Sequence, residues 1–195
     1  MDSAAIMRTP CVLVIAVHLA AFPMLAQETE PSRKPDVPYV PTTDTAVKAM
    51  LRLAKVGSSD VVYDLGCGDG RIVVAAAKNH GARGVGIDID AQLIREAREN
   101  ARRAGVAGRV EFREQDLFKS DFRDATVVAL FLLPALNRRL RPQLEALKPG
   151  TRIISNTFEI AGWKPAREMV VKDDPGDAYY FGSRRLFLWI VPKRK

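Results

Sequence analysis

The stretch Asp64-Leu65-Gly66-Cys67-Gly68-Asp69-Gly70 (DLGCGDG) places an acid and three alternate glycines directly after an apolar run and directly before a helical pattern. Glycine adopts backbone angles that other residues rarely adopt, and it lets a ligand approach the main chain closely. In parallel sheets, ligands bind where the strands end. We therefore interpret the stretch as the turn from a buried strand at 60–65 into a helix at 71–80, with a ligand site beside it.

The spacing of these glycines excludes two phosphate-binding loops. A dinucleotide loop, G-x-G-x-x-G, would need a glycine at position 71 when counted from Gly66, and position 71 is arginine. No Gly-Lys-Ser/Thr sequence follows, so a P-loop is absent from the sequence as well. The loop is therefore expected to face a ligand without a phosphate chain.

Strand and helix patterns alternate on both sides of this loop. Such alternation predicts an α/β fold, a mostly parallel sheet with helices on both faces. A first helix is expected from a cap at Thr43 or Asp44 to about Gly57, and further helices at 71–80, 91–104 and 136–147. Strands are expected at 60–65, 83–88, 110–113, 125–133, 152–155, 168–172 and 185–191. No helical pattern separates the last two strands, so they are predicted to form an antiparallel pair.

Two further acids follow predicted strands. Asp88 ends the second strand, where a carboxylate can accept hydrogen bonds from both hydroxyls of a ribose. Asp116 follows the third strand, where it could accept a hydrogen bond from an adenine amino group. Asp64 could orient an amino group of the ligand, directly or through water. The three acids together suit a nucleoside that carries an amino acid and a positive centre.

An acid followed by G-x-G-x-G resembles the first motif of the class I S-adenosylmethionine-dependent methyltransferases. The matching positions are Asp64, Gly66, Gly68 and Gly70. The resemblance covers residues 60 to about 191, with Asp88 and Asp116 each at a strand end. It implies a Rossmann-like, doubly wound sheet of seven strands with an antiparallel last strand, and S-adenosyl-L-methionine as the cofactor. Cys67 is included with the cofactor-binding loop, as a small residue in a tight turn.

A second resemblance involves Pro38-Tyr39-Val40-Pro41-Thr42, just before the first helix. Together with the DLG-x-GDGR pattern and with Phe158 and Trp163, this segment is similar to the mitochondrial protein-lysine methyltransferases of an ATP synthase subunit and the adenine nucleotide translocase. The resemblance implies a protein lysine as the methyl acceptor. We consider Tyr39 a catalytic residue, because it could cover the methionine end of the cofactor and wall the acceptor channel. A tyrosine that only packs the segment onto the domain is the alternative.

Several acceptor chemistries lack the residues they need. After the fourth strand, Phe131-Leu132-Leu133-Pro134 contains neither an Asn-Pro-Pro-Tyr type motif nor an acid that would hold magnesium. The two cysteines, Cys11 and Cys67, have no zinc spacing, and we predict no metal. A small-molecule or RNA acceptor stays open, as does a non-catalytic S-adenosylmethionine-binding protein. RNA would prefer a concentrated basic patch, whereas the candidate arginines are only loosely grouped: Arg102, Arg103, Arg109 and Arg113.

The N-terminal part differs from the rest of the 195 residues. Arg8 precedes an apolar run from Cys11 to Phe22, as in a secretory signal, and the run is short for a membrane span. We predict a signal peptide at 1–26 and hence export to the periplasm or the medium; without it the protein would be cytoplasmic. Four prolines predict an extended linker at 27–41. Residues 42–195 are then one methyltransferase domain, and the net charge of +7 for the whole chain fits a solvated basic surface.

Overall fold

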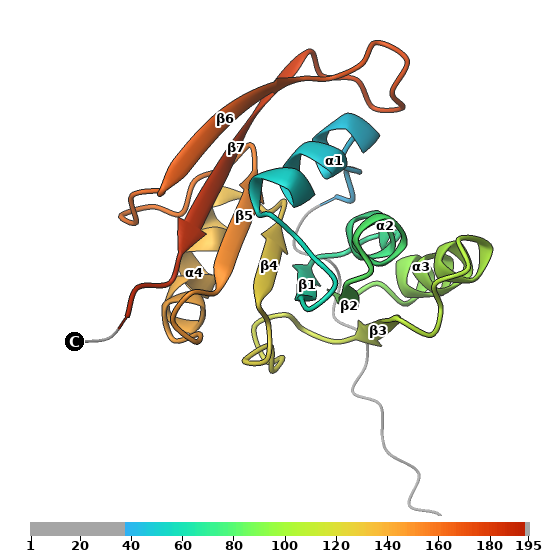
Figure 1. Cartoon of the computed structure of the whole chain (residues 1–195), viewed down its shortest axis with the longest axis horizontal. Helices are drawn as coiled ribbons and strands as arrows, with labels where there is room; N and C mark the ends of the chain where they lie inside the picture. Colours follow the sequence, from blue (N-terminus) through green and yellow to red (C-terminus); the bar gives the residue numbers. More distant parts are fainter. Residues whose placement is uncertain (1–37, 194–195) are drawn as a thin grey trace, which may run out of the picture. The chain divides into compact units, whose positions relative to one another are not determined.

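The structure of the protein is a computed structural model that describes residues 38–193 (Figure 1). The predicted signal peptide and most of the predicted linker lie outside the described residues. Cleavage and export therefore stay predictions, which the intact mass of the protein from its native host would test.

The described residues form seven strands and four helices. The strands are β1 (Val61–Leu65), β2 (Arg83–Asp88), β3 (Val110–Glu114), β4 (Val127–Leu130), β5 (Arg152–Asn156), β6 (Arg167–Lys172) and β7 (Ser183–Ile190). The helices are α1 (Asp44–Leu53), α2 (Arg71–His80), α3 (Ala91–Arg103) and α4 (Pro134–Glu145). None of the helices in this part of the chain is long and apolar enough to cross a membrane.

The strands form one sheet in the order β3-β2-β1-β4-β5-β7-β6. β7 runs antiparallel to both of its neighbours, β5 and β6, and the other neighbouring strands are parallel. This confirms the predicted Rossmann-like sheet with a reversed last strand. The chain builds outward from β1 to β3 and then returns to place β4 on the other side of β1, so the carboxyl ends of β1 and β4 border the switch point where ligands bind in such sheets.

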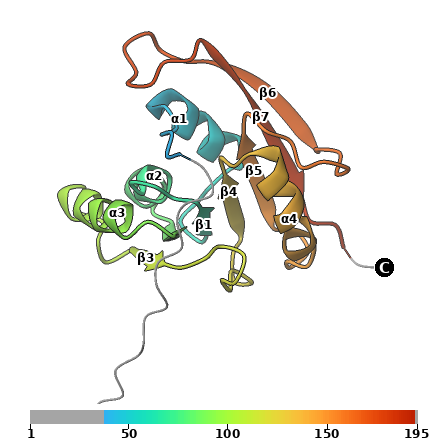
Figure 2. The same cartoon turned by 180° about the vertical axis from the view of Figure 1, so that it is seen from behind.

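Helices cover both faces of the sheet, as the alternation predicted. α1, α2 and α3 pack on one face and α4 on the other, which the two opposite views show (Figures 1 and 2). Successive strand residues point to opposite faces: Val62 belongs to the core under α1 to α3, and Tyr63 belongs to the core under α4. The two cores hold the sheet rigidly beneath the loops at its carboxyl edge.

The boundaries differ most from the prediction at two places, whereas the other predicted ends agree to within two residues. The strand expected at 125–133 is shorter, because β4 ends at Leu130 and α4 begins at Pro134, a residue type well suited to the first turn of a helix. The first helix ends at Leu53 rather than near Gly57. At its start, the Thr43 hydroxyl accepts a hydrogen bond from the Ala46 amide (3.3 Å), so Thr43 is the cap.

Candidate functional site

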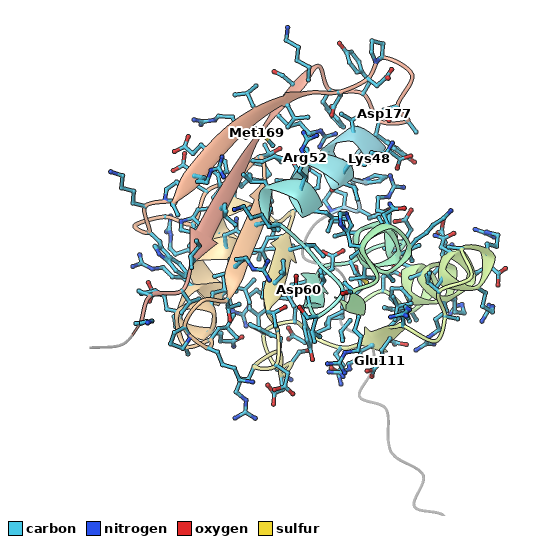
Figure 3. The ribbon with its side chains drawn as sticks, in the orientation of Figure 1. Lys48, Arg52, Asp60, Glu111, Met169 and Asp177 are labelled. Atoms are coloured by element: carbon cyan, nitrogen blue, oxygen red, sulfur yellow. The ribbon has the colours of Figure 1, made fainter. Side chains whose placement is uncertain are left out.

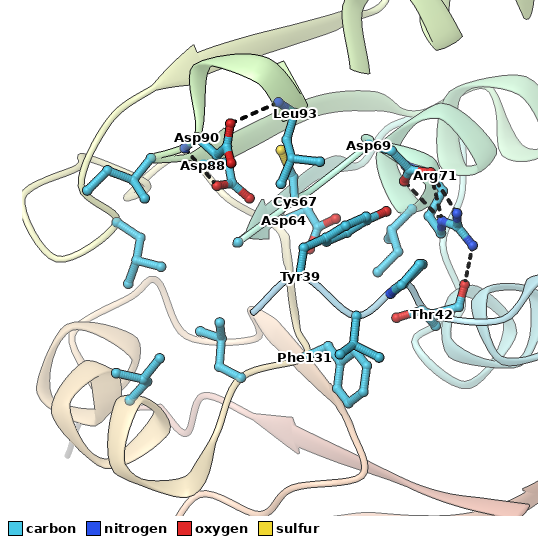
Figure 4. Close-up of a pocket in the computed structure, with 18 of the residues that line it drawn as sticks. Tyr39, Thr42, Asp64, Cys67, Asp69, Arg71, Asp88, Asp90, Leu93 and Phe131 are labelled. Carbon is cyan, nitrogen blue, oxygen red and sulfur yellow. Dashed lines mark hydrogen bonds and ion pairs between the residues drawn. The ribbon is translucent and has the colours of Figure 1, made fainter. Parts of the chain in front are cut away.

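A pocket of about 330 Å³ lies at the carboxyl edge of the sheet (Figure 4). Its lining comes from residues 38–42 and from the segments that follow β1, β2, β3 and β4. Neighbouring strands lie about 4.8 Å apart, so a ligand that reaches from the end of β3 to the end of β4 spans about 14 Å. An elongated ligand fits this pocket, such as a nucleoside with an amino-acid chain.

The loop after β1 is tied to the neighbouring strand by its own backbone. The amides of Gly66 and Cys67 both donate to the carbonyl of Ile87, at 2.8 and 3.0 Å. Gly66 and Gly68 have φ of +81° and +53°, in the region that glycine adopts at little cost. The tight turn brings the backbone of the loop to the wall of the pocket, where Gly66 lies.

Gly68 and Gly70 both face side chains of the protein. A Cβ on Gly70 would lie 2.5 Å from the ring of Phe112, so Gly70 packs beneath the helices rather than facing the pocket. A Cβ on Gly68 would lie 2.1 Å from the ring of Tyr39, where we had expected the ligand. Cys67 is buried and lines the pocket; burial and then the charge of Asp64 raise the pKa of its thiol, which fits a small packing residue.

Asp88 stands at the end of β2 with its carboxylate already oriented. One oxygen accepts a hydrogen bond from the Gly68 amide (2.8 Å) and the other from the Asp90 amide (3.0 Å). A carboxylate has about four acceptor positions, so capacity remains for two ligand hydroxyls. The link to Gly68 joins the glycine loop and the predicted ribose acid into one rigid unit.

Asp64 is 2% exposed and lines the pocket from the end of β1. Burial raises the pKa of its carboxyl well above the usual value, and the nearby charges of Asp88 and Asp69 raise it further. Within the described residues, no hydrogen bond to this carboxylate offsets that cost. A buried acid that faces a pocket in this condition is stabilised by a cation, and the amino group of an amino acid is such a cation.

The segment after β3 supplies both a polar and an apolar contribution. Asp116 lines the pocket, and one of its oxygens accepts a hydrogen bond from the Phe118 amide (2.9 Å). Four apolar residues that we did not predict also line the pocket: Leu117 and Phe118 from this segment, Ile89 after β2 and Leu93 from α3. Apolar side chains of this kind suit the faces of a purine base. Ile89, Leu117 and Phe118 could have been predicted, because they directly follow Asp88 and Asp116 in the sequence.

Tyr39 lies across the middle of the pocket, with Asp64, Cys67 and Asp88 on one side and Phe131 on the other (Figure 4). Partial burial, and then the negative charge of Asp69, raise the pKa of its phenol, so the hydroxyl keeps its proton through the physiological range. The structure thus brings Tyr39 to the predicted site, and its catalytic role stays a prediction.

An arginine that we did not predict holds the Tyr39 segment in place. Arg71 pairs with Asp69 through two nitrogens (Nε to Oδ1 2.9 Å, Nη2 to Oδ2 2.6 Å). Its Nη1 also donates to the carbonyl of Thr42 (2.7 Å). The pair therefore joins the start of α2 to the segment that carries Tyr39, two parts of the chain whose contact no local pattern reveals.

Aromatic rings form the side of the pocket near β4 and β5. Phe131 lines the pocket, and its ring stacks on Phe158 with the centroids 6.2 Å apart. Phe158 follows Thr157, whose φ of +66° is unfavourable for a β-branched residue. The turn is held by Ser155 Oγ, which donates to the Phe158 carbonyl (2.6 Å). Strain that the surroundings maintain in this way is common at functional positions. The sequence indicated Phe158 only through the family resemblance.

The pocket therefore has two chemically different sides. We call the first the acidic wall: it consists of Asp64, Asp69, Asp88, Asp90 and Asp116. We call the second the aromatic wall: it consists of Tyr39 and Phe131, with Phe158 stacked behind. Among the described residues of the lining, Arg71 is the only basic one, and it is paired with Asp69. The pocket is thus strongly acidic in a chain of net charge +7.

Comparisons with known proteins agree with this geometry. The sequence profile of the ANTKMT methyltransferase domain matches residues 64–167. The chain is 49% identical over 163 residues to a protein-lysine N-methyltransferase of Saccharolobus islandicus, a match that covers 83% of this chain and 98% of the relative. It is 36% identical over 130 residues to the adenine nucleotide translocase lysine N-methyltransferase of Mus musculus, a match that covers 66% of this chain and 56% of that relative.

One solved structure is equally similar in sequence. It is described as an RNA methyltransferase from Salinibacter ruber in complex with S-adenosyl-L-homocysteine, the demethylated product of the cofactor. The identity is 49%, the TM-score is 0.71, and the match covers 80% of this chain and 96% of that chain. A relative of this similarity therefore binds the cofactor product on the same fold.

Proposed function

The chain belongs to the ANTKMT methyltransferase family, and we propose that it transfers a methyl group to the side-chain amine of a lysine in a protein. It is an S-adenosylmethionine-dependent methyltransferase, which excludes the non-catalytic binding protein. The proposal concerns the acceptor, for which the relatives carry two different descriptions, protein lysine and RNA.

The pocket suits S-adenosylmethionine on the evidence of its own residues. Asp64 presents a buried carboxylate without a hydrogen bond among the described residues, ready for the amino group of the cofactor. We assign the ribose hydroxyls to Asp88 and the adenine to the surroundings of Asp116, as the sequence predicted. When bound, the cofactor supplies an activated methyl group on a positively charged sulfur.

The lysine proposal is carried by the protein-lysine N-methyltransferase that is 49% identical over 98% of its own length, and it is supported by the charge of the pocket. Five carboxylates and one paired arginine line it, so its potential is negative. A negative pocket attracts a lysine ammonium and repels the phosphates of a nucleic acid, whose binding depends on basic side chains. The acceptor that this pocket favours is a cation.

The two walls have opposite effects on the protonation of the acceptor amine. A lysine amine attacks only when it is unprotonated, and the acidic wall by itself would keep it protonated. The aromatic wall acts in the opposite direction, because desolvation between Tyr39 and Phe131 lowers the pKa of the entering amine. The proton is lost to solvent, and the rings then hold the neutral amine in line for transfer. Positioning of this kind accounts for most of the acceleration that such a displacement needs.

RNA is the second candidate acceptor, because the Salinibacter ruber structure carries that description. Aromatic side chains such as Phe131 and Phe158 can also stack on unpaired bases. The net negative charge of the lining opposes it, since phosphates bind most readily beside basic side chains.

Labelling separates the two acceptors directly. We expect tritiated S-adenosylmethionine to label the protein fraction of an extract and not its RNA fraction, with the label in Nε-methyllysine after acid hydrolysis. A Phe131→Ala variant should lose most of this labelling while it binds S-adenosylhomocysteine as the wild type does, and Val170→Ser, an exposed β6 substitution, serves as the matched control. Label that is released by ribonuclease would overturn the proposal in favour of RNA.

A further inference from the structure

The loop between β6 and β7 carries an unusual exposed surface. Tyr179, Tyr180 and Phe181 are consecutive and are 55%, 52% and 60% exposed. Large apolar side chains are seldom left exposed side by side unless the surface binds something. Among the described residues there are eight exposed large hydrophobic side chains, and six of them lie in three segments: 39–40, 133 and 179–181. Tyr39 and Val40 line the pocket, and residue 133 directly follows Leu132, which also lines it.

Arg184 connects this loop to the aromatic wall. Its guanidinium carbon lies 5.6 Å from the centre of the Phe131 ring and 4.7 Å from the centre of the Phe181 ring. Phe158, Phe131, Arg184 and Phe181 are therefore linked in series, each stacked on or close to the next. The exposed Phe181 ring thus continues the aromatic wall outward from the pocket to the surface.

The loop is anchored rather than loose. Asp173, at its start, accepts hydrogen bonds from Thr43 Oγ1 (2.6 Å), Arg184 Nε (3.0 Å) and the Phe181 amide (3.2 Å). Asp177 lies beside α1 (Figure 3) and accepts from the Thr45 amide (3.4 Å). Both contacts reach the start of α1, which directly follows the segment that carries Tyr39. The loop and the mouth of the pocket therefore form one continuous surface.

The charge of the loop indicates its partner. Residues 173–182 contain three aspartates and neither lysine nor arginine, although the chain has 30 basic residues and 23 acidic ones. Asp173 is buried against Arg184, so the negative charge at the surface comes from Asp174, which is exposed, and from Asp177, which is partly buried. Exposed aromatic faces next to carboxylates attract the side chains of lysine and arginine and repel a phosphate backbone.

We propose that the loop at 173–182 docks the polypeptide around the target lysine and favours segments with further lysine or arginine side chains. The proposal rests on the lysine acceptor argued above, and it names the substrate class that the site selects. The aromatic wall then receives the target lysine, while the loop holds its basic neighbours.

Direct binding tests this with defined peptides. Fluorescein-labelled peptides of equal length carry one central lysine flanked by arginine in the first and by aspartate in the second. With S-adenosylhomocysteine present, we expect the arginine peptide to bind the full-length protein about tenfold more tightly, a preference that shrinks at high salt. Tyr180→Ser combined with Phe181→Ser should reduce its affinity by about five- to thirtyfold, while the affinity for S-adenosylhomocysteine and the melting temperature stay as in the wild type.

A second loop variant tests the proposal even if the aromatic double variant does not fold. Asp174→Asn removes one charge and retains an acceptor for the Gly176 amide, so it should reduce the preference for the arginine peptide without loosening the loop. Val170→Ser, which is exposed on β6 outside the loop, should bind both peptides as the wild type does. Equal affinity for the two peptides, wild-type affinity in the loop variants, or displacement of the arginine peptide by a single-stranded oligoribonucleotide would overturn the proposal.

The same peptides test the docking surface and the lysine acceptor separately. If the arginine peptide binds through the loop and its lysine is then methylated, both the docking surface and the lysine acceptor are supported. If it binds through the loop and is never methylated, the lysine acceptor fails and the docking surface stands. If it is methylated without any dependence on the loop, the lysine acceptor stands and the docking surface fails.

Discussion

The acidic wall and the aromatic wall of the same pocket are built in different ways. The acids follow consecutive strands, so every one of them lies between residues 64 and 116 and belongs to a local strand-end pattern. The aromatic wall and its docking loop combine residue 39 with residues 131, 158 and 181. Phe131 and Phe158 stack directly, and contacts of Arg71, Asp173 and Arg184 join the remaining segments. The cofactor side is therefore local in sequence, and the acceptor side is assembled by long-range contacts.

This difference indicates how the acceptor can change within a family while the cofactor stays the same. Substitutions in the loop at 173–182 or in the turn at 157–158 leave the glycine loop and its acids untouched. Two relatives at the same 49% identity carry different acceptor descriptions. If the two walls are separable, a substitution in one of them should leave the binding properties of the other unchanged.

The largest effect is expected at the buried ion pair of Asp173 and Arg184, whose side chains are 0% and 3% exposed. Asp173→Ala leaves the arginine buried without its partner, which should lower the free energy of unfolding by about 3–5 kcal/mol in a urea titration. Asp124→Ala removes an exposed pair with Lys148 and should have no measurable effect. If the two walls are separable, the folded fraction of Asp173→Ala still binds S-adenosylhomocysteine normally; proportional loss of that affinity would contradict the comparison.

Asp88→Ala tests the acidic wall alone. Loss of hydrogen bonds to a charged group should weaken S-adenosylmethionine binding by about 1.5–3 kcal/mol, measured by calorimetry. The same variant should leave the binding of the arginine-flanked peptide to the loop unchanged. An unaltered cofactor affinity in a folded variant would remove Asp88 from the ribose site.

Gly68→Ala tests the contact between the glycine loop and the aromatic wall, since the new Cβ would lie 2.1 Å from the Tyr39 ring. Gly105→Ala is the matched control, because φ is +72° there and nothing lies within 4 Å of the new Cβ. Both variants therefore lose about 1–2 kcal/mol of stability through the left-handed backbone, and only Gly68→Ala adds a clash. We expect only Gly68→Ala to slow methyl transfer, because it displaces Tyr39. Equal turnover in both variants would show that the position of Tyr39 is unimportant.

Asp64 should make cofactor binding depend on pH. Burial raises the pKa of its carboxyl, and the cationic cofactor prefers the ionised form, so affinity rises with pH through that pKa by up to about tenfold per unit and then levels off. Below this pKa, binding releases a proton, which calorimetry in buffers of different ionisation enthalpy detects. The stability of the free protein shows the opposite sign: Asp64 destabilises the fold as pH rises from about 3.9, its unfolded value, through the folded pKa. Asp64→Asn should abolish both dependences.

The smallest effect is expected from Tyr39→Phe, which removes only a hydroxyl. If that hydroxyl orients the acceptor amine, turnover should fall by about threefold to tenfold with little change in melting temperature, as for one hydrogen bond of about 0.5–1.5 kcal/mol. Tyr39→Ala should slow turnover further. A lower melting temperature in Tyr39→Ala, with normal turnover of the folded enzyme, would establish the packing role instead.

Local patterns in the sequence were sufficient for most of the fold. α2 and β2 have the predicted bounds, because Gly81 ends the helix with φ of +68° and an apolar run of strand length follows. The prediction was less accurate at 125–133, where the apolar residues continue past the strand. Phe131 is apolar because it lines the pocket, and periodicity does not distinguish that reason from burial in a sheet.

The order of strands and helices, the cofactor and the acids that follow β1, β2 and β3 could all be predicted from the amino-acid sequence. The strands, the helices and the acids depend on neighbours within a few residues, whereas the cofactor is what the resemblance of the glycine loop to the class I methyltransferases implied. Three contacts could be found only in the folded chain: Gly68 faces Tyr39, Gly70 packs on Phe112, and Arg184 links Phe131 to Phe181. They join segments far apart in the chain, and only the completed sheet brings these segments within van der Waals distance.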